Sequence, residues 1–234
     1  MAVLSIDTSA AVAAAVVRED GARLASAVVP EQRRHAELLA PMVADLLLEA
    51  SITPADLTAV VGGTGPAPFT GLRVGLVTAR TTALALGIPV LGVPSLDAVA
   101  VQAVADLGLL PDAEVLVATD ARRRQVYWAR YSVLSTAATY GVPDLRRTDG
   151  FDVAAAADLR TDGATVVGQG AALYPDALLA PEDAPQTPDP VLLARIALAR
   201  RAAGVEQPTE PLYLRRPDVQ VPAPRKRAVP VENA

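Results

Sequence analysis

The sequence predicts an α/β protein made of two related lobes, each of which opens with a β-hairpin. Two stretches, VLSIDTSAAVAAAVVRED from Val3 and VLVATDARRRQVYWARYSV from Val115, share an apolar strand, an Asp, a short turn and an alternating second strand. Short apolar runs also alternate with amphipathic helical stretches, a pattern typical of β-sheets covered by helices. The chain of 234 residues is long enough for one large or two small domains.

The first lobe is expected to span residues 1–108, and a helix at residues 190–204 can complete it. Its expected strands lie at 3–6, 12–17, 22–28, 57–61 and 90–93, and its expected helices lie at 33–50, 70–86 and 96–106. Pro41 is expected to kink the first of these helices or to mark a restart. Ser95 can cap the third, because Ser is a preferred N-cap residue.

The second, smaller lobe is expected to span residues 109–214. Its expected strands are a run at 114–118, a run with apolar Val126, Trp128 and Tyr131, and a run at 165–168. The stretch 136–163 is polar and poorly patterned, with helical content expected around residues 153–159. Residues 191–203 read as an amphipathic helix. The Pro-rich and charged residues 215–234 are expected to form a mobile tail.

The composition narrows the function classes. Hydrophobic residues make up 51% of the chain and charged residues 20%, which is typical of a globular protein. A formal net charge of −5 gives no sign of a general nucleic-acid binder. The absence of cysteine excludes disulfides, thiolate metal sites and a Cys nucleophile. No uncharged apolar run reaches the roughly 18 residues of a membrane helix, and the N-terminal apolar run lacks a basic region, so we expect a cytoplasmic protein with no membrane partner.

Motifs for metal or nucleophilic catalysis are scarce. His35 is the only histidine, so the paired histidines of an H-E-x-x-H metal site cannot occur. A Ser-His-Asp triad would need His35 as its base, and no G-x-S-x-G turn is present. We interpret His35 as a polar residue at a helix start. A magnesium site built from carboxylates stays open, because Mg²⁺ takes oxygen ligands and needs few from the protein.

The stretch GTGPAPFTG at residues 63–71 begins like a phosphate-binding loop. It has Pro where the dinucleotide fingerprint needs its third Gly, and it lacks the Lys of a Walker A loop. Pro66 and Pro68 also remove two backbone N–H donors, which a phosphate cradle needs most. The N–H groups of Gly71 and Leu72 can still bind an anion or a capping Thr70 side chain.

A different phosphate pattern follows the first strand. In actin-like and sugar-kinase-like ATPases, a first-strand Asp and a hydroxyl-bearing turn meet Mg²⁺ and phosphate. In the second lobe, Asp120 precedes Arg122 and two further arginines, and this turn lacks the Gly residues that let a backbone approach phosphate closely. The three arginines can pair with phosphate or form a solvated turn, and we favour the solvated turn. The candidate cofactor-binding residues are therefore Asp7, Thr8, Ser9 and Asp120.

The helix expected at 70–86 has a stripe of small residues at every fourth position, namely Gly71, Gly75, Ala79 and Ala83. A Gly inside a soluble helix costs roughly 1 kcal/mol relative to Ala, so something is expected to pack closely there. Patterning leaves two candidates open, a partner protein or an element of the same lobe. Arg73 and Arg80 lie beside the stripe. The residues expected to face the core of the lobe are Leu72, Leu76, Val77 and Leu84.

Several blocks in fixed order resemble the bacterial TsaB (YeaZ) family. They are Ile6-Asp7-Thr8-Ser9, His35 with Leu38-Leu39-Ala40-Pro41, GPAPFTGLRVG at residues 65–75, Asp120-Ala121-Arg122 with Val126-Tyr127, and Pro211-Leu212-Tyr213-Leu214-Arg215. The blocks span nearly the whole chain, and the G-P-x-x-F-T-G-L-R-x-G block is the specific one. The family usually has Gly-Ser where this chain has Ala67-Pro68, which weakens any phosphate role for the loop.

The resemblance implies a two-lobed actin/Hsp70/sugar-kinase-like (ASKHA) fold, in which each lobe is a mixed β-sheet with flanking helices. It implies a shortened paralogue of the transferase TsaD, whose metal-binding H-x-x-x-H motif this chain cannot supply with one histidine. The implied role is a non-catalytic subunit, with no catalytic or metal-binding residues of its own. It would pair with TsaD, and with the ATPase TsaE in a larger assembly, to make N6-threonylcarbamoyladenosine at position 37 of tRNAs that read ANN codons.

The resemblance also implies where the partners meet. The pairing surface would be the helices near residues 33–50 and 70–86, which self-associate into a homodimer when TsaD is absent. ATP or ADP with Mg²⁺ would bind, if at all, at the partner interface, and tRNA would be contacted only through the complex. The expected interface residues are His35, Leu38, Leu39, Met42, Gly71, Leu72, Arg73, Gly75, Ala79 and Ala83.

Two other functions are weighed against this one. The first is an active ATPase or phosphotransferase of the same fold that uses Asp7 and Asp120 around Mg²⁺. The second is a metallopeptidase, a label attached to relatives of this fold, which the single histidine disfavours.

Overall fold

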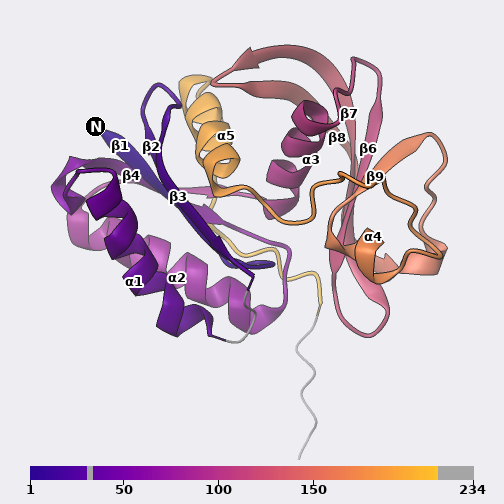
Figure 1. The fold of residues 1–234 in the computed structure, drawn as a ribbon, viewed down its shortest axis with the longest axis horizontal. Helices are drawn as coiled ribbons and strands as arrows, with labels where there is room; N and C mark the ends of the chain where they lie inside the picture. Colours follow the sequence, from indigo (N-terminus) through magenta and orange to yellow (C-terminus); the bar gives the residue numbers. More distant parts are fainter. Residues whose placement is uncertain (31–33, 216–234) are drawn as a thin grey trace, which may run out of the picture.

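The computed structural model describes residues 1–30 and 34–215 and contains two mixed β-sheets, each with helices packed on it (Figure 1). The first sheet has the strand order β3-β2-β1-β4-β5. Its strands are β1 (Ala2–Asp7), β2 (Val12–Arg18), β3 (Arg23–Val29), β4 (Leu57–Gly63) and β5 (Val90–Val93). A single 3-10 turn, η1 (Pro54–Asp56), precedes β4 and carries the capping box of Thr53 and Asp56. The strands expected for this lobe are thereby confirmed.

The second sheet repeats the first without its last strand and has the order β8-β7-β6-β9. Its strands are β6 (Glu114–Asp120), β7 (Gln125–Thr139), β8 (Val142–Ala155) and β9 (Ala164–Val167). β6 pairs antiparallel with β7 and parallel with β9, as β1 pairs antiparallel with β2 and parallel with β4. The repeat read from the sequence is therefore a repeat of sheet topology, and the two-lobed ASKHA-like fold class is confirmed.

Helices cover both faces of the first sheet. Two lie side by side on one face, α1 (His35–Glu49) and α2 (Phe69–Leu86), and α5 (Pro190–Ala202) lies on the other (Figure 1). Because successive strand residues point to opposite faces, Leu4 and Ile6 of β1 pack toward α1 and α2, whereas Val3 packs toward α5. α3 (Ser95–Asp106) contacts α5 and also packs against β6 and β7, so it joins the two lobes.

The longest hairpin of the molecule corrects one expectation. Residues 153–159 were expected to contain a helix, but β8 continues to Ala155 and is followed by a single 3-10 turn, η2 (Ala156–Asp158). β8 is an edge strand that pairs only with β7, and most of its outward side chains are polar. Pairing with a neighbouring strand thus overrides a local sequence that lacks strand alternation.

The helix starts correct three further expectations. Ser95 does not cap α3, because Pro94 is the N-cap residue and Ser95 is the first helical residue. Thr70 does not cap α2, whose N-cap residue is Pro68 and whose start has no side-chain cap. α1 continues through Pro41, so the restart expected there is wrong. The residue at which the first helix was expected to begin, residue 33, lies outside the described part of the chain.

After α5, the chain returns to the first lobe as an extended segment at residues 205–215, which we call the strap. The Gly92 N–H donates to the Gln207 carbonyl (3.0 Å), and a Cβ at Gly92 would lie 1.9 Å from the Pro208 carbonyl oxygen. Arg80 of α2 donates to the Thr209 carbonyl (2.7 Å). The strap therefore covers the edge of β5 and one side of α2. Residues 216–234, most of the expected mobile tail, lie outside the described residues.

Within residues 1–30 and 34–215, no helix has the length and apolar character needed to cross a membrane.

Candidate functional site

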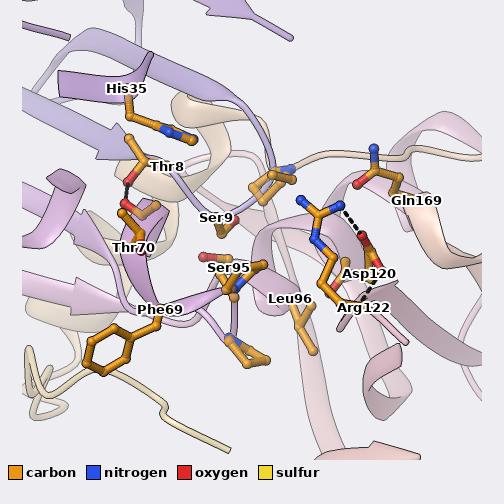
Figure 2. Close-up of a pocket in the computed structure, with 17 residues that line it drawn as sticks. Thr8, Ser9, His35, Phe69, Thr70, Ser95, Leu96, Asp120, Arg122 and Gln169 are labelled. Carbon is orange, nitrogen blue, oxygen red and sulfur yellow. Dashed lines mark hydrogen bonds and ion pairs between the residues drawn. The ribbon is translucent and has the colours of Figure 1, made fainter. Parts of the chain in front are cut away.

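A cavity of about 170 Å³ lies between the two lobes, where the β1–β2 turn faces the β6–β7 turn (Figure 2). The first lobe lines it with Thr8, Ser9, Ala10, His35, Pro66, Ala67, Pro68, Phe69, Thr70, Gly71, Ser95 and Leu96. The second lobe lines it with Thr119, Asp120, Arg122, Gln169 and Pro188. Gln169 begins the short helix α4 (Gln169–Leu173). The structure thus brings Thr8, Ser9 and Asp120 together, as the sequence predicts, and adds Thr119 and Gln169, which the sequence did not single out.

Asp7, the fourth candidate, does not line this cavity. Its side chain is buried, and both carboxylate oxygens accept hydrogen bonds within the first lobe. Oδ1 accepts from the Ser9 N–H (2.8 Å) and the Ser9 hydroxyl (2.5 Å), and Oδ2 accepts from the Ser95 hydroxyl (2.5 Å). Burial raises the pKa of Asp7, and the hydrogen bonds from Ser9 and Ser95 oppose that rise. A Cβ at Gly63 would lie 1.9 Å from Oδ2, so only glycine leaves room for this carboxylate.

The carboxylate of Asp120 is engaged by its own turn. Oδ1 accepts from the Arg122 N–H (2.7 Å), and Oδ2 lies 3.2 Å from the Arg122 guanidinium. With Asp7 sealed beneath the cavity and Asp120 paired with Arg122, the two carboxylates do not fit the ligand set of a magnesium-bound nucleotide. Among residues 1–30 and 34–215, no group of three or more His, Asp or Glu side chains is placed to hold a metal ion.

The turn that carries Arg122 has an unusual backbone. Arg122, Arg123 and Arg124 have φ values of 65°, 55° and 61°, so three non-glycine residues in a row adopt the left-handed conformation. Each such residue costs free energy of order 1 kcal/mol. All three side chains are exposed, as expected for a solvated turn. The solvated turn does not account for Arg122, whose guanidinium reaches into the cavity (Figure 2).

Thr8 links the cavity to α2. Its hydroxyl donates to the Gly71 carbonyl (2.8 Å) and accepts from the Gly75 N–H (2.9 Å), so it bridges the two groups that a regular helix pairs directly. A Cβ at Gly75 would lie 2.4 Å from the Thr8 hydroxyl oxygen, and a Cβ at Gly71 would lie 3.0 Å from the Thr8 carbonyl oxygen. The two glycines are thus explained by the β1–β2 turn of the same lobe, one of the two alternatives that the sequence left open.

Burial corrects the expected partner surface. Among its ten residues, those buried within the chain are His35, Leu39, Met42, Leu72, Gly75, Ala79 and Ala83. Leu38 and Gly71 are half-buried. Arg73 is exposed, but its guanidinium lies 3.5 Å from the Phe69 ring centroid, and its Nε donates to the Tyr213 hydroxyl of the strap. Most of these side chains form the core beneath α1 and α2 and offer a partner no free surface.

Two of the four α2 residues that the sequence assigned to the core, Leu72 and Leu76, are buried as expected. The other two, Val77 and Leu84, are instead 56% and 83% exposed. Leu48 of α1, which the sequence did not assign to the core, is 79% exposed. The buried face of α2 therefore includes the Gly and Ala stripe together with Leu72 and Leu76, and only Val77 and Leu84 of the expected core side face outward. The exposure of Val77 and Leu84 depends on which elements pack against α2, and periodicity alone does not supply that information.

Comparison with known proteins assigns the family. The chain matches the family described as "TsaD: tRNA N6-adenosine threonylcarbamoyltransferase" over residues 22–158. An uncharacterized protein of Mycobacterium tuberculosis is 44% identical over 221 residues, which cover 93% of each chain. The tRNA threonylcarbamoyladenosine biosynthesis protein TsaB of Escherichia coli is 35% identical over 131 residues, 56% of this chain and 55% of that protein.

A solved structure agrees with these matches. YeaZ from Pseudomonas aeruginosa has a TM-score of 0.75 and 30% sequence identity, and the likeness covers 91% of this chain and 99% of that one. The resemblance seen in the motif blocks is therefore confirmed at the levels of sequence and fold. The chain belongs to the TsaD-related TsaB/YeaZ family.

Proposed function

We propose that the chain takes part in the biosynthesis of N6-threonylcarbamoyladenosine in tRNA, as a non-catalytic subunit that pairs with a TsaD-type transferase. The Escherichia coli relative carries that pathway in its name, and the match to the TsaD family extends over residues 22–158. A chain that shares sequence with a transferase but has a single histidine is suited to bind the transferase rather than to replace it. TsaE would join the larger assembly, and tRNA would be met only through it.

The observation that carries the proposal is a set of exposed apolar side chains on neighbouring helices. Leu48, Val77 and Leu84, which we call the α1–α2 outer face, are all more than half exposed. α1 and α2 run in the same direction, because they lead into the parallel strands β4 and β5 and their starts meet where His35 lies beside Gly71. Leu48 and Leu84 therefore lie toward the same end of the helix pair. Val77 and Leu84 are seven residues apart and so share one face of α2. Exposed large apolar side chains that share a face are typical of protein-binding surfaces.

The same face suits the partners that the resemblance implies. The strap holds one side of α2, and α1 packs against the other, so the outer face is what remains for a second protein. In the absence of TsaD, a second copy of this chain would cover the same apolar residues and form the homodimer. ATP or ADP with Mg²⁺ at the TsaD interface stays a prediction of the resemblance.

The alternative, an ATPase that uses Asp7 and Asp120 around Mg²⁺, has less support. The carboxylate of Asp7 does not face the cavity, because its two oxygens accept hydrogen bonds from Ser9 and Ser95. Asp120 is paired with Arg122. A subunit that only binds and positions a partner does not need Asp7 or Asp120 to coordinate a metal ion.

Reconstitution of the modification tests the proposal. TsaD and the other pathway proteins of the same organism are incubated with an unmodified tRNA transcript, ATP, threonine and bicarbonate, and the modified nucleoside is quantified by mass spectrometry. We expect product only when this chain is present, with an equal mass of an unrelated protein as the control. Equal product without the chain would contradict the proposal. Steady ATP hydrolysis by the isolated chain would favour the alternative.

A further inference from the structure

We propose that a groove beneath the β7–β8 hairpin, which we call the hairpin groove, binds a small amphipathic anion with one carboxylate or phosphate group and a short aliphatic body. The groove measures about 970 Å³, within the roughly 300–1,000 Å³ of pockets that hold small molecules. Among the described residues, none lines both this groove and the cavity that holds Thr8 and Asp120. The site goes beyond the proposed function, which assigns the chain a partner and no ligand.

The length of the β7–β8 hairpin creates the groove. β7 has 15 residues, whereas its neighbour β6 has 7, so the hairpin extends beyond the rest of its sheet. It reaches from the second lobe across α3 to α5 (Figure 1). Its tip meets the first lobe, where a Cβ at Gly21 would lie 3.3 Å from the Tyr140 ring. The hollow that remains is bounded by the hairpin, α3 and α5.

Aliphatic side chains line the body of the groove. They are Val101 of α3, Ile196, Ala199 and Ala203 along α5 and its C-cap, and Val142 and Leu145 of β8. The three residues of α5 share one helix face, because they are three and four positions apart. The alanines at 199 and 203 leave the space that a larger side chain would fill. Among the described lining residues, Tyr131 is the only aromatic one, so the groove suits an aliphatic body better than a stacked ring.

Two arginines face one point at the end of the groove that lies away from the hairpin tip. Arg147 pairs with Tyr131 across the hairpin, so the two side chains lie on the same face of the sheet. Arg200 of α5 donates to Asp97 Oδ2 (2.6 Å), and the Tyr131 hydroxyl donates to Asp97 Oδ1 (2.7 Å). Burial and Asp97 raise the pKa of Tyr131, and the positive charges of Arg147 and Arg200 oppose that rise. Both guanidinium groups therefore act near the Tyr131 hydroxyl.

The positive charge at this end is only partly neutralised. Arg146 and Arg147 line the groove, and neither forms an ion pair with a described residue. The Arg147 guanidinium lies 4.0 Å from the Phe151 ring centroid, and this contact with the face of a ring leaves its N–H groups for an oxyanion. A guanidinium presents these donors in a fork that matches the oxygens of carboxylate and phosphate.

Two carboxylates also line the groove, and neither cancels this charge. Asp97 accepts from Tyr131 and Arg200 with its two oxygens. Asp144 is exposed and pairs with Ser135 in the hairpin register, which places it nearer the tip than Arg147. Three arginines against two carboxylates leave the lining with a net positive charge, which favours an anionic ligand. Aliphatic walls beside this charge call for a ligand that has both parts.

Titration of the full chain with octanoate, followed by backbone amide NMR at constant ionic strength, tests the proposal. We expect saturable shifts concentrated in residues 135–147 and 196–205. Acetate lacks the aliphatic body and 1-octanol lacks the charge, so each should bind about tenfold or more weakly than octanoate. Octyl phosphate is titrated in parallel, and the tighter of the two octyl anions identifies the head group that the site prefers.

Variants test the two parts of the site separately. Arg147→Gln should weaken octanoate binding by about tenfold or more, the size expected for one charge-assisted contact. Arg201→Gln is the matched control, because it removes the same charge from the last turn of α5 at a residue that does not line the groove. Ala199→Leu narrows the groove without changing its charge and should also weaken binding.

Three results would overturn the proposal. They are the absence of saturable shifts with both octyl anions, acetate or 1-octanol binding as tightly as octanoate, and equal affinity of Arg147→Gln and Arg201→Gln for octanoate. Pairing with TsaD is measured separately, on a different face of the molecule, so these results do not bear on the proposed function.

Discussion

Asp7 stands where the sequence pattern of an ATPase places a metal-binding carboxylate, and the structure uses it to hold the first lobe together. Its carboxylate accepts hydrogen bonds from Ser9 in the β1–β2 turn and from Ser95 at the start of α3, which is 88 positions away along the chain. Asp7 therefore connects these two parts of the lobe. Ser95 is thereby drawn away from the N-cap role that its sequence context suggests. A carboxylate tied to two hydroxyls inside the protein is a structural group rather than a ligand for Mg²⁺.

The first prediction concerns the proton on Asp7. Burial raises its pKa above the ordinary 3.8, so the folded protein holds this proton more tightly than the unfolded chain does. The unfolded chain then binds fewer protons in the window between 3.8 and the raised pKa, so this residue's contribution to stability falls as the pH rises through that window. Asp7→Asn removes the titrating group, so the variant should lack this fall.

Urea unfolding of the wild type and of Asp7→Asn, measured between about pH 3 and pH 8, checks the sign. The difference in unfolding free energy, wild type minus variant, should decrease as the pH rises through the window and then become constant. A difference that is constant from acid to neutral pH would show that Asp7 has no raised pKa.

Residue patterns could identify the turn but not the roles within it. Asp7, Thr8 and Ser9 were found because a strand that ends in Asp and two hydroxyls is a visible local signal. Thr119 and Gln169 gave no such signal, because they become site residues only when the second lobe is placed against the first. Whether Asp7 faces the cavity or the core is decided by Ser95 and Gly63, which no local pattern connects to it.

α2 is the element on which the account depends most, and a single hydroxyl fixes its first turns. Thr8 bridges the Gly71 carbonyl and the Gly75 N–H, and the absence of side chains at both glycines makes room for it. The cost of two glycines in one helix is therefore offset by a tertiary contact within the lobe. A larger side chain at Gly75 would disrupt this contact within the lobe, so a loss of partner binding in such a variant would not identify a partner surface.

The second prediction follows from that bridge. Thr8→Val keeps the shape of the side chain but removes the hydroxyl. The Gly71 carbonyl and the Gly75 N–H then lose their shared partner, and the new methyl group stands between them. We expect the variant to unfold about 1–3 kcal/mol more easily, the cost of leaving buried polar groups without partners.

Thr8→Ser is the matched control, because it keeps the hydroxyl and loses only a methyl group. Equilibrium urea unfolding at neutral pH, where the pKa of Asp7 affects all three proteins alike, gives the comparison. Equal stability of Thr8→Val and the wild type would mean that the bridge contributes nothing to folding.

Helices with a strongly periodic apolar face could be predicted from the sequence, whereas a strand that depends on pairing with its neighbour could not. The helices at His35–Glu49, Phe69–Leu86 and Pro190–Ala202 match their expected ranges closely, because an apolar face repeats along each. β8 was missed because an exposed edge strand needs no alternation of its own when β7 supplies the register. The side of α2 that faces outward was also missed, because small residues can mark either a tight internal contact or an open groove.

Across the whole molecule, the interlobe cavity and the α1–α2 outer face involve different parts of the same two helices. The cavity contacts the N-terminal ends of α1 and α2 through His35 and Gly71, whereas Leu48 and Leu84 lie near their C-terminal ends. The duplicated sheets and the interlobe cavity are features of an enzyme fold, while the exposed apolar residues are features of a binding protein. The central claim is that this chain has kept the fold and uses the α1–α2 outer face to hold a TsaD-type transferase.

The affinity of the chain for the TsaD protein of its own organism, measured by titration calorimetry on wild type and single variants, tests that claim most directly. Val77→Arg places a charge in the middle of the outer face and should weaken binding by about tenfold or more, as expected for a well-packed interface centre. Leu179→Arg makes the same kind of change on the second lobe at a residue that is 84% exposed, and it should bind like the wild type. Wild-type affinity in Val77→Arg, or an equal loss in Leu179→Arg, would contradict the account.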